Sequence, residues 1–172
     1  MIKIDGISLN KEEKTEVKIN HYVAINFQTK RNTEGGARYI LLKNLNQSII
    51  EFKFPSNSMI LKEFSVVLIK KRLHRTLRGS DKILSGIPIF AIPEGDELLD
   101  WDNRTPIKFN ANFGAFIGSN FIEIIINDYN QFDVCIQCGD VQFLLWNYCL
   151  AGIKVLNRSK EDLEIFAQHL KE

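Results

Sequence analysis

Five carboxylates surround one tryptophan in the segment from position 94 to position 102, here called the acidic segment. Its residues of interest are Glu94, Asp96, Glu97, Asp100, Trp101 and Asp102. Carboxylates at this density repel one another and favour a nearby cation, and a tryptophan between charges is a good interface anchor when exposed. We therefore expect these residues to bind a basic protein partner. In the alternative, Trp101 packs into the core and the acids pair with basic residues of the same chain. A calcium site is disfavoured because the spacing of an EF-hand loop is missing.

A basic stretch is the second candidate for chemistry. Lys71, His74, Arg75 and Arg78 have the spacing i, i+3, i+4 and i+7, which places them on one face of a helix. Apolar residues opposite them, with Gly79 as a C-terminal cap, predict a basic amphipathic helix. Such a face could bind the phosphates of DNA or RNA. Against this, the formal net charge is only +1 and no aromatic residues interleave for base stacking. A solvated helix face is therefore the alternative.

The three cysteines allow a metal site to be considered. Cys135 and Cys138 have the C-x-x-C-G spacing of a zinc knuckle, but four ligands would also require Cys149 and a histidine. Residues three apart on a strand point to opposite faces, so the first two thiols would not converge. We expect buried, reduced thiols and no bound metal or other cofactor.

Catalytic motifs are missing from the sequence. His21, His74 and His169 have no pattern of a nucleophile and its base around them. A phosphate-binding loop, a dinucleotide fingerprint, a zinc-protease motif and a nucleophile elbow are all lacking. We therefore expect a non-catalytic protein, and a metal-dependent enzyme of unknown reaction is an unsupported alternative.

Length and composition are those of one ordinary globular domain. The chain has 172 residues, 45% of them hydrophobic and 25% charged, so we expect a single domain over residues 1–172. The first residues lack the apolar run of a secretory signal. The longest apolar stretch, 141–155, is too short and too often interrupted for a membrane helix. We expect a cytoplasmic protein that does not contact a membrane.

The elements that must position these residues are clearest near the end of the chain. Alternating apolar residues in 132–138 and 141–148, on either side of Gly139 and Asp140, predict an antiparallel hairpin. Ser159 followed three residues later by Asp162 predicts a capping box. The apolar residues that follow recur at helical spacing, which predicts a C-terminal helix with one apolar stripe.

Weaker patterns predict the rest of the sheet. Further strands are expected over residues 2–9, 17–27, 39–42, 49–54, 87–92, 121–126 and 153–156. Phe113 and Phe116 lie beside Gly114 and Gly118, which is typical of a bulged strand or a close backbone approach, and we expect their rings in the core rather than in a pocket. Residues 64–69 are dense in β-branched side chains and could form a buried strand instead of part of the basic helix.

Together these patterns predict an α+β domain with a mainly antiparallel sheet, a central basic helix and a C-terminal helix packed on one face. With two charge clusters of opposite sign and no catalytic motif, a protein-binding module is the function that the sequence favours. We hypothesise an immunity or antitoxin role in a bacterial cell, in which the acidic segment neutralises a basic partner such as a nuclease toxin. Nucleic-acid binding by the basic helix is the alternative.

Overall fold

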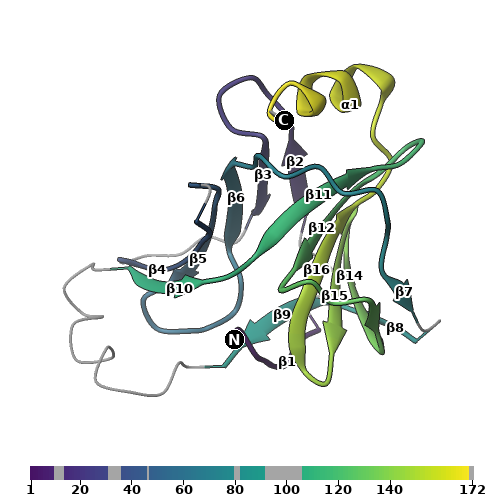
Figure 1. Ribbon diagram of the computed structural model, residues 1–172. Coiled ribbons are helices and arrows are strands. Elements are labelled where there is room, and N and C mark those ends of the chain that lie inside the picture. The colour runs from purple at the N-terminus through teal and green to yellow at the C-terminus, as the bar shows by residue number, and fades with distance from the viewer. Residues whose placement is uncertain (10–13, 31–35, 46, 80–81, 92–105, 171–172) are drawn as a thin grey trace.

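Strands dominate the computed structural model, which describes residues 1–9, 14–30, 36–45, 47–79, 82–91 and 106–170. Two mainly antiparallel sheets, each of six strands in the described part of the chain, lie side by side (Figure 1). Within the same residues there is one helix, near the C-terminal end, and it is too short and too polar to span a lipid bilayer. The prediction of a mainly antiparallel sheet with a C-terminal helix is confirmed.

The first sheet has the strand order β10-β4-β5-β6-β3-β2. Its strands are β2 (Thr15–Lys18), β3 (Ile25–Thr29), β4 (Ala37–Lys43), β5 (Ile49–Pro55), β6 (Glu63–Leu68) and β10 (Ile107–Asn110). Its strands pair antiparallel except β10, which runs parallel to β4 at one edge. Side chains alternate between faces along each strand, so Ile50, Phe52 and Phe54 of β5 are all buried.

The second sheet has the order β11-β12-β16-β15-β14-β8. Its strands are β8 (Ile83–Ser85), β11 (Phe113–Ile117), β12 (Ile122–Ile126), β14 (Val134–Cys138), β15 (Val141–Trp146) and β16 (Cys149–Val155). The predicted hairpin is confirmed as β14 and β15, which are joined through Gly139 at a φ of 59°. The short strand β8 lies parallel to β14 and ends the sheet at this edge.

The two sheets share one hydrophobic core. Phe143 of the second sheet has its ring centroid 6.1 Å from that of Phe27 and 5.9 Å from that of Phe64, both in the first sheet. All three side chains are fully buried. Edge-to-face packing of large rings fixes the distance between the sheets, and burial of this area drives their association.

The helix α1 (Lys160–Ala167) lies across one end of the sheets (Figure 1). Ser159 accepts a hydrogen bond from the backbone N–H of Asp162, whose carboxylate accepts one from the N–H of Ser159, so the predicted capping box is confirmed. Phe166 enters the core, and His169 hydrogen-bonds the carbonyl of Asn20 at 2.7 Å, in the connection between β2 and β3.

The predicted central basic helix is wrong. Residues 63–68 form strand β6, as the alternative for residues 64–69 anticipated, and residues 70–79 continue as an extended segment, here called the strap. The strap ends in β7 (Arg78–Gly79), which pairs with β13 (Gln131–Phe132). The N–H of Leu73 donates to the carbonyl of Ala115 at 2.7 Å, and the N–H of Ala115 donates to the carbonyl of Lys71 at 2.9 Å. Backbone pairing with a distant strand thus replaces the local hydrogen bonds of a helix.

Two further short strands cross between the sheets. β1 (Ile4–Ser8) pairs antiparallel with β9 (Ile87–Phe90), with a bulge between Ile4 and Gly6. β9 follows β8 after a single residue, Gly86, so the chain leaves the edge of the second sheet and turns at once to join β1. This corner positions the site described next.

Candidate functional site

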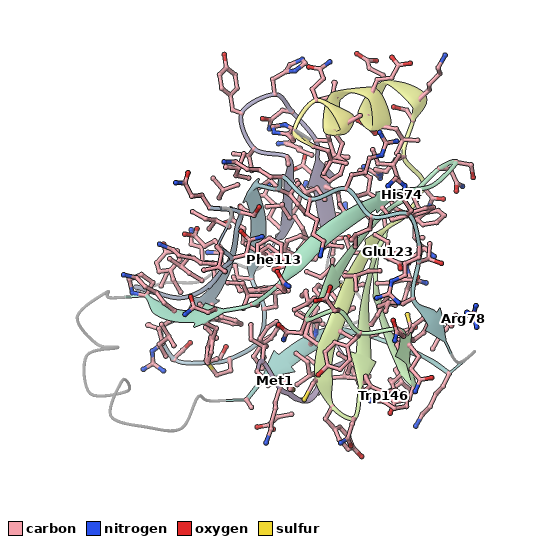
Figure 2. The ribbon with its side chains drawn as sticks, viewed as in Figure 1. Met1, His74, Arg78, Phe113, Glu123 and Trp146 are labelled. Atoms are coloured by element: carbon pink, nitrogen blue, oxygen red, sulfur yellow. The ribbon has the colours of Figure 1, made fainter. Side chains whose placement is uncertain are left out.

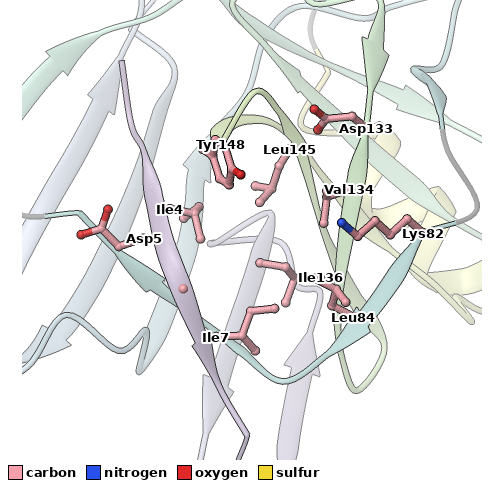
Figure 3. Close-up of a pocket in the computed structure, with 11 residues that line it drawn as sticks. Ile4, Asp5, Ile7, Lys82, Leu84, Asp133, Val134, Ile136, Leu145 and Tyr148 are labelled. Carbon is pink, nitrogen blue, oxygen red and sulfur yellow. The ribbon is translucent and has the colours of Figure 1, made fainter.

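A cavity of about 340 Å³ lies in the angle between β1 and the edge of the second sheet formed by β15, β14 and β8 (Figure 3). Its lining is largely aliphatic and includes Ile4, Ile7, Leu84, Val134, Ile136 and Leu145. Asp5, Lys82, Asp133 and Tyr148 border the same space and are its polar members. This size and this mixture of many apolar groups with a few polar ones are typical of ligand and side-chain binding pockets.

Both ends of β1 are attached to the walls of the cavity. At one end the N–H of Ile4 donates to the carbonyl of Tyr148 at 2.8 Å. At the other end the backbone of Ser8 approaches Gly86, which has a φ of 149°. A Cβ on Gly86 would lie 2.2 Å from Cγ2 of Ile7 and 2.6 Å from the carbonyl oxygen of Ser8. Only glycine can occupy this corner without these clashes. The corner holds β1 across the edge of the second sheet, and the cavity lies between them.

Tyr148 forms the rim in an unfavourable backbone conformation. Asn147 and Tyr148 are the two loop residues between Trp146 and Cys149, which pair across β15 and β16, and their φ values are 49° and 62°. Such a two-residue turn favours asparagine followed by glycine, and a bulky residue with positive φ is unusual. The Tyr148 side chain is nonetheless 73% exposed. The chain thus keeps an aromatic ring at the rim at a cost in backbone energy, as binding sites often do.

The carboxylate of Asp133 borders the cavity, and one of its two oxygens has no hydrogen-bond partner. Its Oδ2 accepts a hydrogen bond from the N–H of Asn147 at 3.1 Å. Its Oδ1 is shielded from solvent and has no hydrogen-bond donor. Buried acceptors are nearly always satisfied, so Oδ1 is an exception within the fold, whereas the hydrogen bond at Oδ2 is at an exposed position. In Figure 3 the carboxylate of Asp5 points away from the cavity, and the ammonium of Lys82 lies next to Val134.

The residues of the acidic segment lie outside the described residues. Glu94, Asp96, Glu97, Asp100, Trp101 and Asp102 therefore remain a predicted partner-binding set. The described strands nearest to them in the sequence are firmly placed, since Phe90 at the end of β9 and Ile107 at the start of β10 are both buried.

The basic residues of the strap do not form the predicted common face. Lys71 pairs with Asp128, with Nζ 3.5 Å from Oδ1, and Arg75 donates to the side chain of Asn130 and to the carbonyl of Asp128. Arg78 is exposed at the outer edge (Figure 2), and His74 is exposed higher on the strap. The i, i+3, i+4, i+7 spacing gathers side chains only on a helix, and along an extended chain it distributes them over different directions.

A buried carboxylate attaches the strap to the second sheet. Glu123 of β12 is 1% exposed, and its Oε1 accepts the N–H of Leu77 at 2.6 Å. Its Oε2 lies 3.4 Å from Nζ of Lys154 on the neighbouring strand β16. Both oxygens have partners in the fold, so its role is structural.

The cysteines are divided between two hydrophobic clusters. Cys138 belongs to the core shared by the sheets, whereas Cys135 packs with Leu77 and Leu144 on the other face of β14. The prediction that these two thiols point to opposite faces is confirmed. Burial raises the pKa of the Cys135 thiol to about 11, so it is an unreactive group at neutral pH. Within the described ranges no three His, Cys, Asp or Glu side chains are grouped to hold a metal ion.

The phenylalanines near Gly114 fill space rather than line the cavity. Phe113 is buried in the shared core, and Phe116 packs on Phe121 with ring centroids 5.9 Å apart. A Cβ on Gly114 would lie 2.8 Å from the carbonyl oxygen of Lys71, which is the close backbone approach that the sequence predicted.

Sequence reasoning missed the cavity. Its residues come from β1, β8 and the β14–β15–β16 hairpins, which are far apart in the sequence, so no local spacing reveals them. A weak local signal was available in Asn147 and Tyr148, because an asparagine followed by a bulky residue in a two-residue turn departs from the favoured Asn-Gly.

Comparison with known proteins adds no family. No protein-family model matches the chain, and no curated protein matches its sequence significantly.

Proposed function

We propose that this chain is a protein-binding module that recognises a basic partner. The observation that carries the proposal is the rim of the cavity, which combines the side chains of Tyr148 and Leu84, 73% and 37% exposed, with the carboxylate of Asp133. Exposed apolar side chains around a hollow are typical of surfaces that another protein covers. A carboxylate at the same place favours a partner that carries positive charge.

The acidic segment supports the same preference for a basic partner. Its support comes from the sequence, where five carboxylates lie within nine positions around Trp101. In this proposal Trp101 inserts into the partner surface and the surrounding carboxylates pair with its basic residues.

The biological role that suits these features is toxin neutralisation. A nuclease must hold an anionic substrate and therefore has a basic cleft. A small protein that places carboxylates and an aromatic anchor over such a cleft blocks it by charge and by shape. We accordingly propose an immunity or antitoxin role, with a nuclease toxin as the model partner.

Partner capture with charge variants tests the proposal. The variant carries Asp100→Asn and Asp102→Asn, and the control carries Glu161→Gln and Glu164→Gln on exposed positions of α1, so both lose two negative charges. Each immobilised full-length chain is incubated with native lysate at low and at high salt. We expect the wild type and the control to retain the same basic protein at low salt and the acidic-segment variant to lose it. Identical capture by all three chains would contradict the proposal.

Nucleic-acid binding through Lys71, His74, Arg75 and Arg78 is the second candidate. Its support is the exposure of His74, Arg75 and Arg78, and its weakness is the loss of the helical face that would align them. It predicts that affinity for a short duplex falls steeply with salt and that Arg78→Ala lowers the slope by about one. A titration without salt-sensitive binding would remove this candidate.

A further inference from the structure

We infer that the cavity receives a lysine or arginine side chain of the basic partner. The inference rests on the proposed function, because it names the group that the partner inserts, but it concerns the cavity alone and not the acidic segment. The occupant is a long alkyl stem that ends in a cation.

The aliphatic lining suits the stem. Ile4, Ile7, Val134, Ile136 and Leu145 present methyl and methylene groups to a space of about 340 Å³. Long basic side chains bury their methylene groups against such surfaces and keep the charged end at a polar rim. Burial of each methylene group removes apolar surface from water, which favours an alkyl chain over a purely polar group.

The rim suits the cation. Asp133 borders the cavity with a carboxylate whose Oδ2 takes part in an exposed hydrogen bond, and an incoming N–H group on a cation would form a charge-assisted hydrogen bond with this oxygen. The ring of Tyr148 stands at the same end of the cavity in Figure 3 and can interact with a cation through its face. Occupation by the partner also explains why a tyrosine, and not a glycine, stands at a position with a φ of 62°.

Asp133 and Tyr148 determine the direction of entry. Both lie at one end of the cavity, whereas the ammonium of Lys82 lies next to Val134 on one wall (Figure 3). The head group of the occupant therefore lies toward Asp133 and Tyr148, with its stem running over Leu145 and Ile136.

Small probes of matched length test the cavity without the partner. The full-length chain, labelled with ¹⁵N, is titrated with n-hexylammonium, 1-hexanol and hexanoate at millimolar concentrations, where fragments of this size bind. We expect saturable shifts of the backbone amides around Asp133, Leu145 and Tyr148. The order of affinity should be ammonium, then alcohol, then carboxylate. Hexylguanidinium in place of hexylammonium distinguishes an arginine from a lysine as the preferred occupant.

Two charge variants and one control test the contribution of charge to the affinity for these probes. Asp133→Asn keeps an acceptor for the N–H of Asn147 and removes the charge, so it should weaken hexylammonium about tenfold and leave hexanol unchanged. Glu161→Gln is the charge-matched control, since that carboxylate is exposed on α1 and does not line the cavity, and it should leave both probes unchanged. Leu84→Lys places a further cation at the exposed rim and should also weaken hexylammonium.

The outcomes are distinguishable from those of the proposed function. Equal binding of all three probes, preferred binding of hexanoate, or no saturable shift would overturn the occupant inferred here. Loss of partner capture in the acidic-segment variant, together with any of these results, would leave the protein-binding function intact and remove only the cavity from it. The converse pattern would show a cation-binding cavity in a protein whose acidic segment has another use.

Discussion

At the scale of single residues, strain and unsatisfied groups coincide at one place. Tyr148 occupies a left-handed position that suits glycine, and the neighbouring N–H of Asn147 holds only one oxygen of Asp133. Residues that cost stability persist where they serve another purpose. By contrast, Glu123 is buried with both oxygens engaged and contributes to stability alone. The two carboxylates differ in role because their surroundings differ.

Replacement of Tyr148 tests this argument directly. Tyr148→Gly should raise the free energy of unfolding by about 1 kcal/mol, because glycine adopts a φ of 62° without the Cβ clash of an L-residue. Chemical denaturation of the two proteins measures the change, and Tyr22→Gly controls for loss of an exposed tyrosine, since Tyr22 is 91% exposed and has negative φ. An equal or larger gain in the control would show that the turn is unstrained.

Because of Cys135, we expect the free energy of unfolding to depend on pH in the alkaline range. Burial raises the pKa of its thiol from 9.0 to about 11, with Lys154 opposing the shift weakly. Between these values the folded chain keeps a proton that the unfolded chain loses, so stability falls as pH rises. The fall should reach about 1 to 3 kcal/mol by the upper value. Urea denaturation of wild type and Cys135→Ala across this range measures it, and parallel curves would contradict the assignment.

At the scale of elements, local signals were predictable and long-range pairing was not. The β14–β15 hairpin and α1 follow from turn residues, alternation and a capping box that lie within a few positions of one another. The strap was predicted as a helix because its charges have helical spacing, yet its backbone bonds with Ala115 and its link to Glu123 cross more than forty positions. Tertiary pairing overrode a weak local preference. The cavity was unpredictable for the same reason.

The corner at Gly86 is expected to contribute to the stability of the fold. Gly86→Ala should lower the free energy of unfolding by about 2 kcal/mol or more, because the new Cβ would overlap Ile7 and the backbone of Ser8. Thermal or chemical denaturation measures the change. Gly36→Ala is the matched control, since the nearest atom that its Cβ would meet among the described residues is the Cβ of Ser56, at 3.9 Å. If the two variants lost the same stability, β1 would not depend on this corner.

At the scale of the whole molecule, two sheets pack around one aromatic core, and the cavity lies at the edge of the second sheet. Phe143 joins the sheets from within, and the edge formed by β8, β14 and β1 leaves a cavity that the core does not fill. The acidic segment follows β9, the strand that pairs with β1, in the sequence. We propose that a basic partner covers the carboxylates and the apolar rim together.

The most direct test of that claim is the salt dependence of affinity for the purified captured partner. Association constants are measured by titration calorimetry for wild type, for Asp100→Asn with Asp102→Asn, and for the α1 control. We expect the wild type and control to show the same steep loss of affinity with salt. The acidic-segment variant should bind at least about tenfold more weakly at low salt, with a shallower slope. Three superimposable salt curves would contradict recognition of a basic partner through the acidic segment.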